Sequence, residues 1–113
     1  MIGIGVNTRI FLYRGSADMR KGFDGLSGIV RDELGEDPMN GTLFVFLNGT
    51  RDKIKALYWD RDGYAIWTKR LERGRFAFPS ESGGVVGWSE LALLLDGVSV
   101  RVLKRSARWT KSA

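Results

Sequence analysis

The chain has 113 residues, of which 43% are hydrophobic and 27% charged, a composition typical of one globular domain and not of a disordered chain. It contains neither Cys nor His, which excludes disulfides, thiolate metal sites, a Cys nucleophile and a His general base. The net charge of +5 favours an anionic partner, with nucleic acid as the first candidate.

The positive charge is unevenly distributed along the chain. Residues 1–50 carry five Lys/Arg and six Asp/Glu, residues 51–75 carry eight against four, and residues 101–113 carry five with no acid. The second half and the tail should therefore meet an anionic partner, although a basic face can also serve only to keep a protein in solution. No apolar run is long enough to span a membrane and the N-terminus lacks a signal-peptide pattern, so we expect a cytoplasmic protein, nucleoid-associated if it binds DNA, with no membrane partner.

The first half of the chain predicts a strand followed by a helix. Residues 8–13 are rich in β-branched and aromatic side chains, which favours a strand. Residues 18–34 place apolar side chains on one helical face, with Ser16 or Asp18 as the N-cap and Gly35 as a left-handed residue at the C-terminal end. These apolar positions are Met19, Phe23, Leu26, Val30 and Leu34.

Three glycines recur at a spacing of three in this helix, at Gly22, Gly25 and Gly28. Each lowers the stability of an exposed helix by up to about 1 kcal/mol relative to Ala, so a structural or functional role is expected for them. We expect close packing of the helix on the sheet, with a flat strip for another backbone as the alternative. At the helix start, the free N–H groups together with Arg20 and Lys21 could hold a phosphate. The alternative is that Asp18 simply caps the helix and that Arg20 and Lys21 form a solvated face.

Three further runs predict an antiparallel meander. Residues 42–47 are apolar enough for a strand buried on both faces, and residues 53–59 and 64–71 alternate around an Asp-Gly turn at residues 60–63. Residues 80–84 are expected to form a flexible loop, residues 88–96 a short helix, and residues 98–103 a final strand.

The predicted fold is one α+β domain over residues 1–103, followed by a basic, mobile tail at residues 104–113. Its antiparallel β-meander has four to five strands. One amphipathic helix lies on a face of the sheet, and the short C-terminal helix closes an edge.

The predicted hairpin carries cations and flat rings together, which is the combination that nucleic-acid-binding surfaces use. With Arg20 and Lys21, the candidate phosphate contacts are Lys53, Lys55, Lys69, Arg70, Arg73 and Arg75. The candidate stacking rings are Tyr58, Trp59, Tyr64 and Trp67. Large aromatic side chains on half-buried strands commonly belong to the core, and this alternative applies above all to Trp59 and Trp67.

Catalysis finds little support in the sequence. Asp52, Asp60, Asp62 and Glu72 are the only plausible metal cluster, but turn chemistry explains Asp-Gly without a metal, and the calcium-loop pattern is incomplete. We therefore expect no enzyme activity, catalytic residue, metal or cofactor.

Five collinear segments carry a resemblance to a known family. They are DMRKGFDGL (18–26), GTLFVFLN (41–48), DKIKALYWDRDG (52–63), KRLERGRF (69–76) and LALLLDG (91–97). Together they resemble the accessory protein of the insertion-sequence 66 family, the TnpB or Orf2-like protein encoded beside the transposase. The resemblance implies a bacterial mobile element and a role in transposition, while catalysis belongs to the separate transposase.

The leading hypothesis is a non-catalytic accessory factor for transposition that binds element DNA through a basic β-surface, the transposase, or both. One alternative is a protein adaptor that docks the transposase through Trp88, Leu91 and Leu95 or through the glycine strip, without touching DNA. A second alternative is a small metal-dependent nuclease that uses the four carboxylates.

Overall fold

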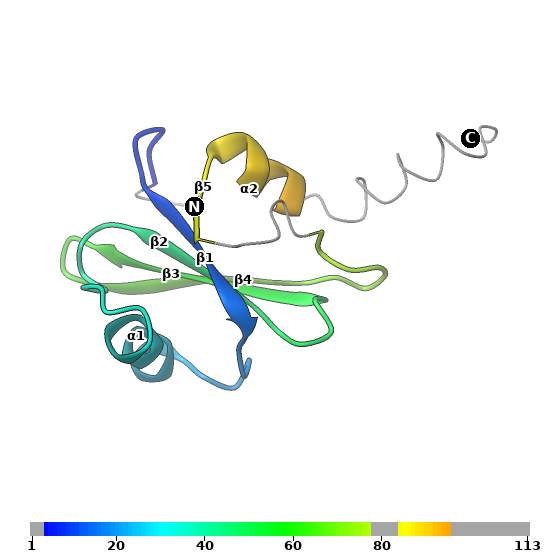
Figure 1. Ribbon diagram of the computed structural model, residues 1–113, viewed down its shortest axis with the longest axis horizontal. Coiled ribbons are helices and arrows are strands. Elements are labelled where there is room, and N and C mark those ends of the chain that lie inside the picture. The colour runs from blue at the N-terminus through cyan, green and yellow to red at the C-terminus, as the bar shows by residue number, and fades with distance from the viewer. Residues whose placement is uncertain (1–3, 78–83, 96–113) are drawn as a thin grey trace.

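The computed structural model of the protein describes residues 4–77 and 84–95. Its elements are β1 (Ile10–Ser16), α1 (Phe23–Asp32), β2 (Leu43–Leu47), β3 (Lys53–Asp60), β4 (Gly63–Arg70), β5 (Gly84–Val86) and α2 (Trp88–Leu95) (Figure 1). The predicted strand at residues 98–103 and the predicted mobile tail lie outside the described residues.

The five strands form one sheet in the order β4-β3-β2-β1-β5. This confirms an α+β domain with five strands, but the sheet is mixed and not antiparallel throughout. β1 and β2 are parallel, because α1 carries the chain back to the end of the sheet where β1 began. The other three strand pairs are antiparallel, including the predicted pairs β2-β3 and β3-β4.

α1 covers one face of the sheet and builds the first core. Leu26, Ile29 and Val30 of the helix pack against Phe44 and Phe46 of β2, and all five side chains are buried. The helix follows the predicted apolar spacing but begins five residues later than expected, because Asp18 does not cap it. Its N-cap is Gly22, which offers no side chain to the free N–H groups.

α1 ends at Asp32, two residues before the predicted end, but Gly35 is left-handed as predicted. Gly35 has φ +64°, the left-handed conformation that a residue with Cβ adopts only with strain. The N–H of Glu36 then donates to the carbonyl of Val30 at 3.0 Å, which satisfies one of the last helical carbonyls.

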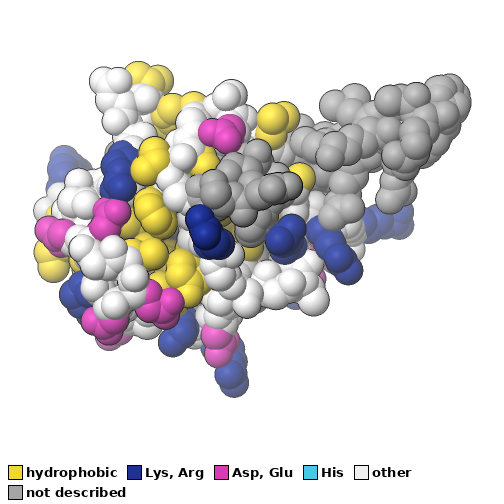
Figure 2. Space-filling view, viewed as in Figure 1, with side chains coloured by type: hydrophobic (Ala, Val, Ile, Leu, Met, Phe, Trp, Pro, Cys, Tyr) yellow, Lys and Arg dark blue, Asp and Glu magenta, His cyan; other side chains and the backbone are white. Residues whose placement is uncertain are grey.

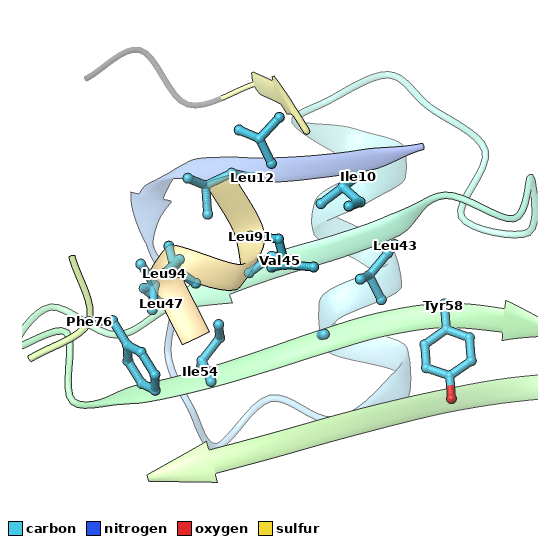
Figure 3. Close-up of a cluster of buried hydrophobic side chains, with 12 residues drawn as sticks. Ile10, Leu12, Leu43, Val45, Leu47, Ile54, Tyr58, Phe76, Leu91 and Leu94 are labelled. Carbon is cyan, nitrogen blue, oxygen red and sulfur yellow. The ribbon is translucent and has the colours of Figure 1, made fainter. Parts of the chain in front are cut away.

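α2 covers the opposite face of the sheet and builds the second core (Figure 3). Leu91 and Leu94 point from the helix towards Leu12, Val45 and Ile54 of three different strands. The prediction that this helix closes an edge is therefore wrong, since the apolar face of β1, β2 and β3 needs a cover as much as the face under α1 does. Between the two helices, β2 is buried along its whole length, as its sequence predicted.

β5 was not predicted, and its first residue falls in the segment expected to be a flexible loop. It has only three residues, too few for a strand pattern, and is defined by its pairing with Ile10, Phe11 and Leu12 of β1. The residue before the next helix is held by a side chain of its first turn: the Gly87 N–H donates to Glu90 Oε1 at 2.9 Å, which is one half of a capping box.

The glycine strip of α1 does not serve packing against the sheet, contrary to the expectation. A Cβ added at Gly22 or Gly28 would meet no atom within 4 Å, and one added at Gly25 would meet only the Lys21 side chain. The strip therefore lies on the outward surface of the helix.

Replacing Gly28 with Ala should raise the free energy of unfolding by about 0.5–1 kcal/mol. Ala loses less conformational entropy than Gly when the helix forms, and the added methyl group has open space. Gly35→Ala is the matched change, and at φ +64° it should lower stability by about 1 kcal/mol. Urea unfolding of both variants measures the difference. A destabilised Gly28→Ala variant would contradict an open strip.

Candidate nucleic-acid interface

One end of the sheet collects most of the described cations. β1 and β2 are parallel and both finish there, with Ser16 paired to Leu47. β3 begins at the same end and β4 ends there, with Lys53 opposite Arg70. We call it the cationic end. Its ten cations are Arg14, Arg20, Lys21, Arg51, Lys53, Lys55, Lys69, Arg70, Arg73 and Arg75, and its four carboxylates are Asp18, Asp24, Asp52 and Glu72.

The opposite end of the sheet has the reverse balance. It holds the last turn of α1, the start of β1 and the turn between β3 and β4, which carry six carboxylates against Arg9, Arg31 and Arg61. These carboxylates are Asp32, Glu33, Glu36, Asp37, Asp60 and Asp62. Figure 2 shows acidic side chains gathered over α1 at the lower left, and Lys and Arg side chains to the right of the centre as well as on the left. The described part of the chain is therefore electrically polarised along its strands.

Two lysines of the cationic end also hold the fold together. Lys55 Nζ donates to the Lys21 carbonyl at 2.8 Å and ties the segment before α1 to β3. Lys69 Nζ lies 3.3 Å from the Leu95 carbonyl at the end of α2, where a cation also suits the helix dipole. Because strand side chains alternate, Lys69 faces α2 whereas Lys53, Lys55 and Arg70 face the α1 side. The eight predicted cations thus share an end of the sheet and not one face of it.

Local contacts engage some of these charges. Arg20 Nη2 donates to Asp18 Oδ2 at 2.8 Å and the Arg20 backbone N–H donates to Asp18 Oδ1 at 2.9 Å; these bonds, led by the side-chain one, lower the pKa of Asp18 to about 2. The 3.5 Å contact between Arg70 and Glu72 joins two exposed side chains, so it contributes little. Of the cations at this end, Arg20 is consequently a weaker candidate for phosphate than Lys53.

A small pocket of about 150 Å³ lies where the two parallel strands end. It is lined by Arg14, Gly15 and Ser16 of β1, by Leu47 at the end of β2, and by Asn48, Gly49 and Arg51 of the turn that follows. Open sheets with parallel strands commonly bind ligands beyond the carboxyl ends of those strands. Arg14 was not among the residues predicted from the sequence, because it lies in a half of the chain with no net positive charge. Its one signal was the Arg-Gly-Ser run that ends a strand.

The predicted stacking rings lie apart from most of the cations. Tyr58 is only 6% exposed and belongs to the core under α2, so its prediction as a stacking ring is wrong. Trp59 and Tyr64 pack edge to face at 5.1 Å, next to the turn at the acidic end, and the Tyr64 hydroxyl is buried without a hydrogen-bond partner among the described residues. Trp67 is half-buried against the α2 core. The main role of these rings in the structure is therefore intramolecular packing.

The carboxylates considered for metal catalysis do not come together. Asp60 and Asp62 lie at the turn of the hairpin, whereas Asp52 and Glu72 flank its other end, about 25 Å away along the strands. Within residues 4–77 and 84–95, no group of three acidic side chains is placed to hold a metal ion. Neither described helix has the length and apolarity needed to cross a membrane.

These features define a small α+β domain whose mixed sheet separates positive from negative charge. Residues 8–105 match the family model of the IS66 Orf2 like protein, and the chain belongs to that family. It is 38% identical to the "Uncharacterized protein y4hO" of Sinorhizobium fredii (strain NBRC 101917 / NGR234), over 98% of each chain. It is also 36% identical to "Uncharacterized protein y4jC" of the same strain, over 93% of this chain and 92% of that relative. No solved structure matches the chain.

Membership of this family confirms the resemblance drawn from the five sequence segments. It associates the chain with the transposition of IS66-type insertion sequences as an accessory protein.

Titration of Asp18 should give a pKa of about 2, and Arg20→Ala should return that pKa towards the ordinary value of 3.8. A lowered pKa in the folded state means that the Asp18–Arg20 contact stabilises the protein above pH 3.8 and that this contribution is lost as the pH falls through about 2. Carboxyl NMR chemical shifts measured between pH 1.5 and 6 follow the group directly. An Asp18 pKa unchanged in the variant would contradict the pairing.

Proposed function

We propose that this protein is a non-catalytic accessory factor that binds DNA of its insertion sequence by contacts between phosphates and the cationic end. The observation that supports this most is the gathering of ten cations with four carboxylates at one end of the sheet. A field of one sign over a compact surface attracts a polyanion, and each neutralised phosphate releases counterions.

The dimensions of the cationic end suit a nucleic-acid backbone. The four strands from β4 to β1 span about 15 Å across their ends, and the loops at residues 48–52 and 71–76 extend this surface. The loops lie together, since the Phe76 N–H donates to the Arg51 carbonyl at 2.7 Å and the Leu71 N–H to the Asp52 carbonyl at 2.7 Å. Several phosphates can therefore be contacted at once.

The placement of the rings favours duplex DNA over a single strand. Binding of single strands depends on aromatic side chains on which bases stack. Here Trp59 and Tyr64 pack against each other near the acidic end, and Tyr58 is buried. Contacts to phosphates position a protein on DNA without reading its sequence, so we expect modest sequence preference from this surface.

The C-terminal sequence is also basic. α2 ends at Leu95, whose carbonyl lies 3.3 Å from Lys69 Nζ, so this helix ends at the cationic end. The sequence beyond it contains Arg101, Lys104, Arg105, Arg108 and Lys111 with no acid after Asp96.

Affinity for duplex DNA from the ends of the element should fall about 10²- to 10³-fold between 50 and 200 mM salt, as expected for about five neutralised phosphates. Lys53→Glu and Arg73→Glu should each weaken binding about tenfold and make the salt dependence shallower. Fluorescence anisotropy across a salt series measures both effects.

Arg31→Glu is the matched control, because it makes the same charge change in the last turn of α1, at the acidic end. It should weaken binding far less than Lys53→Glu. Binding that is independent of salt, or that the three variants weaken equally, would rule out the cationic end as the DNA contact.

A second candidate function, docking of the transposase, is supported by exposed apolar side chains near α2. Val6, Val85 and Leu93 are 83%, 61% and 55% exposed, and the Trp88 indole N–H donates to the Val6 carbonyl at 3.0 Å, which joins the N-terminal segment to α2. Leu91, proposed from sequence for this surface, is buried and cannot contribute.

Co-purification with the transposase should survive nuclease and 500 mM salt if this surface docks it, since apolar contacts are not screened. Leu93→Ser should then reduce recovery at least fivefold, and Lys53→Glu should leave it unchanged. The opposite pattern, loss with nuclease or with Lys53→Glu alone, would attribute the association to DNA.

A further inference from the structure

β4 is the outermost strand on one side of the sheet, and its outer edge pairs with none of the described residues. The strand has eight residues, whereas β5 at the other side has three. Proteins commonly protect such an edge with a Pro, a bulge or a charge in its middle. Residues 63–67 contain no Pro and no charged side chain, and the register with β3 continues without a bulge. The edge is therefore built to accept another strand.

The register shows which backbone groups this edge offers. Asp60 opposes Gly63 across a turn of two residues, and the residues that flank such a turn share hydrogen bonds. Bonded and non-bonded pairs then alternate along the hairpin, so the N–H and C=O groups of Tyr64, Ile66 and Thr68 point away from β3.

Charge along this edge is self-complementary. Asp62 precedes the strand, Lys69 and Arg70 end it, and the residues between them carry no charge. A second copy running antiparallel would therefore place its basic end beside the acidic end of the first. A parallel neighbour would instead set like charges side by side.

We propose that β4 pairs antiparallel with β4 of a second copy of this chain, about a two-fold axis centred on Ile66. This register sets Asp62 opposite Arg70 of the second copy, and Tyr64 opposite Thr68. On the other face it sets the small Ala65 opposite the large Trp67. The axis is perpendicular to the sheet, so the α1 faces of both copies lie on the same side.

The pairing joins the two sheets into one and removes both open β4 edges. Each copy keeps its own cationic end, and the two ends point in opposite directions because the copies are antiparallel. Arg70 also approaches Glu72 of its own chain at 3.5 Å, but both side chains are exposed and that contact is weak. The dimer does not depend on DNA binding, so its failure would leave the proposed function standing.

The test is the oligomeric state of the full chain, measured by sedimentation equilibrium without DNA. Asp62→Arg and Arg70→Asp should each weaken dimerisation about tenfold, because each sets like charges opposite one another twice per dimer. The double variant Asp62→Arg/Arg70→Asp should restore it to within about threefold. Arg31→Glu is the control and should leave the dimer unchanged, and circular dichroism verifies that every variant is folded.

Backbone amide exchange gives a second measurement that does not depend on variants. Protection of the Tyr64, Ile66 and Thr68 amides should increase with protein concentration, since these groups bond only to the second copy. Three outcomes would overturn the proposal. They are a monomer at 200 µM, a dimer indifferent to both single reversals, and protection that is independent of concentration, which would mean that the same chain covers this edge.

Discussion

The parallel pairing of β1 with β2 is the constraint on which the rest of the structure depends. Because α1 returns the chain to its starting side, both strands finish at the same end of the sheet, and the segment that leads into α1 begins there. β3 and β4 then run antiparallel beside them, which adds the start of one and the end of the other. Cations that are scattered from residue 14 to residue 75 meet at one place for this reason.

The two cores explain which side chains stay available at that place. α1 and α2 cover opposite faces of the sheet, so the apolar residues of β2 and β3 are buried on both sides. Long cationic side chains are confined to the strand ends and loops, where they can reach water. The aromatic rings near the hairpin turn are less available to a ligand, because they stabilise the fold through the apolar area that they bury.

Lys55 and Lys69 show how the same charges connect fold and function. One bonds the Lys21 carbonyl before α1 and the other lies at the end of α2, so both helices are anchored at the cationic end. Substituting either lysine would disturb packing as well as charge. Lys53 and Arg73, which have no such contact in the described structure, report on the electrostatic surface more directly.

The sequence by itself determined most of the local elements and the buried face of α1, but neither β5 nor the first residue of α1. Apolar spacing identified α1, uninterrupted apolar residues identified β2, and alternation around the Asp-Gly turn identified the hairpin, because these patterns depend only on neighbours along the chain. The IS66 relationship could also be read from sequence. Only the tertiary structure decided that β1 and β2 are parallel, that the glycine strip faces outward, that Tyr58 is buried and that Arg14 joins the cationic end. Each of these depends on contacts between residues distant in sequence, and no local pattern records which strand lies beside which.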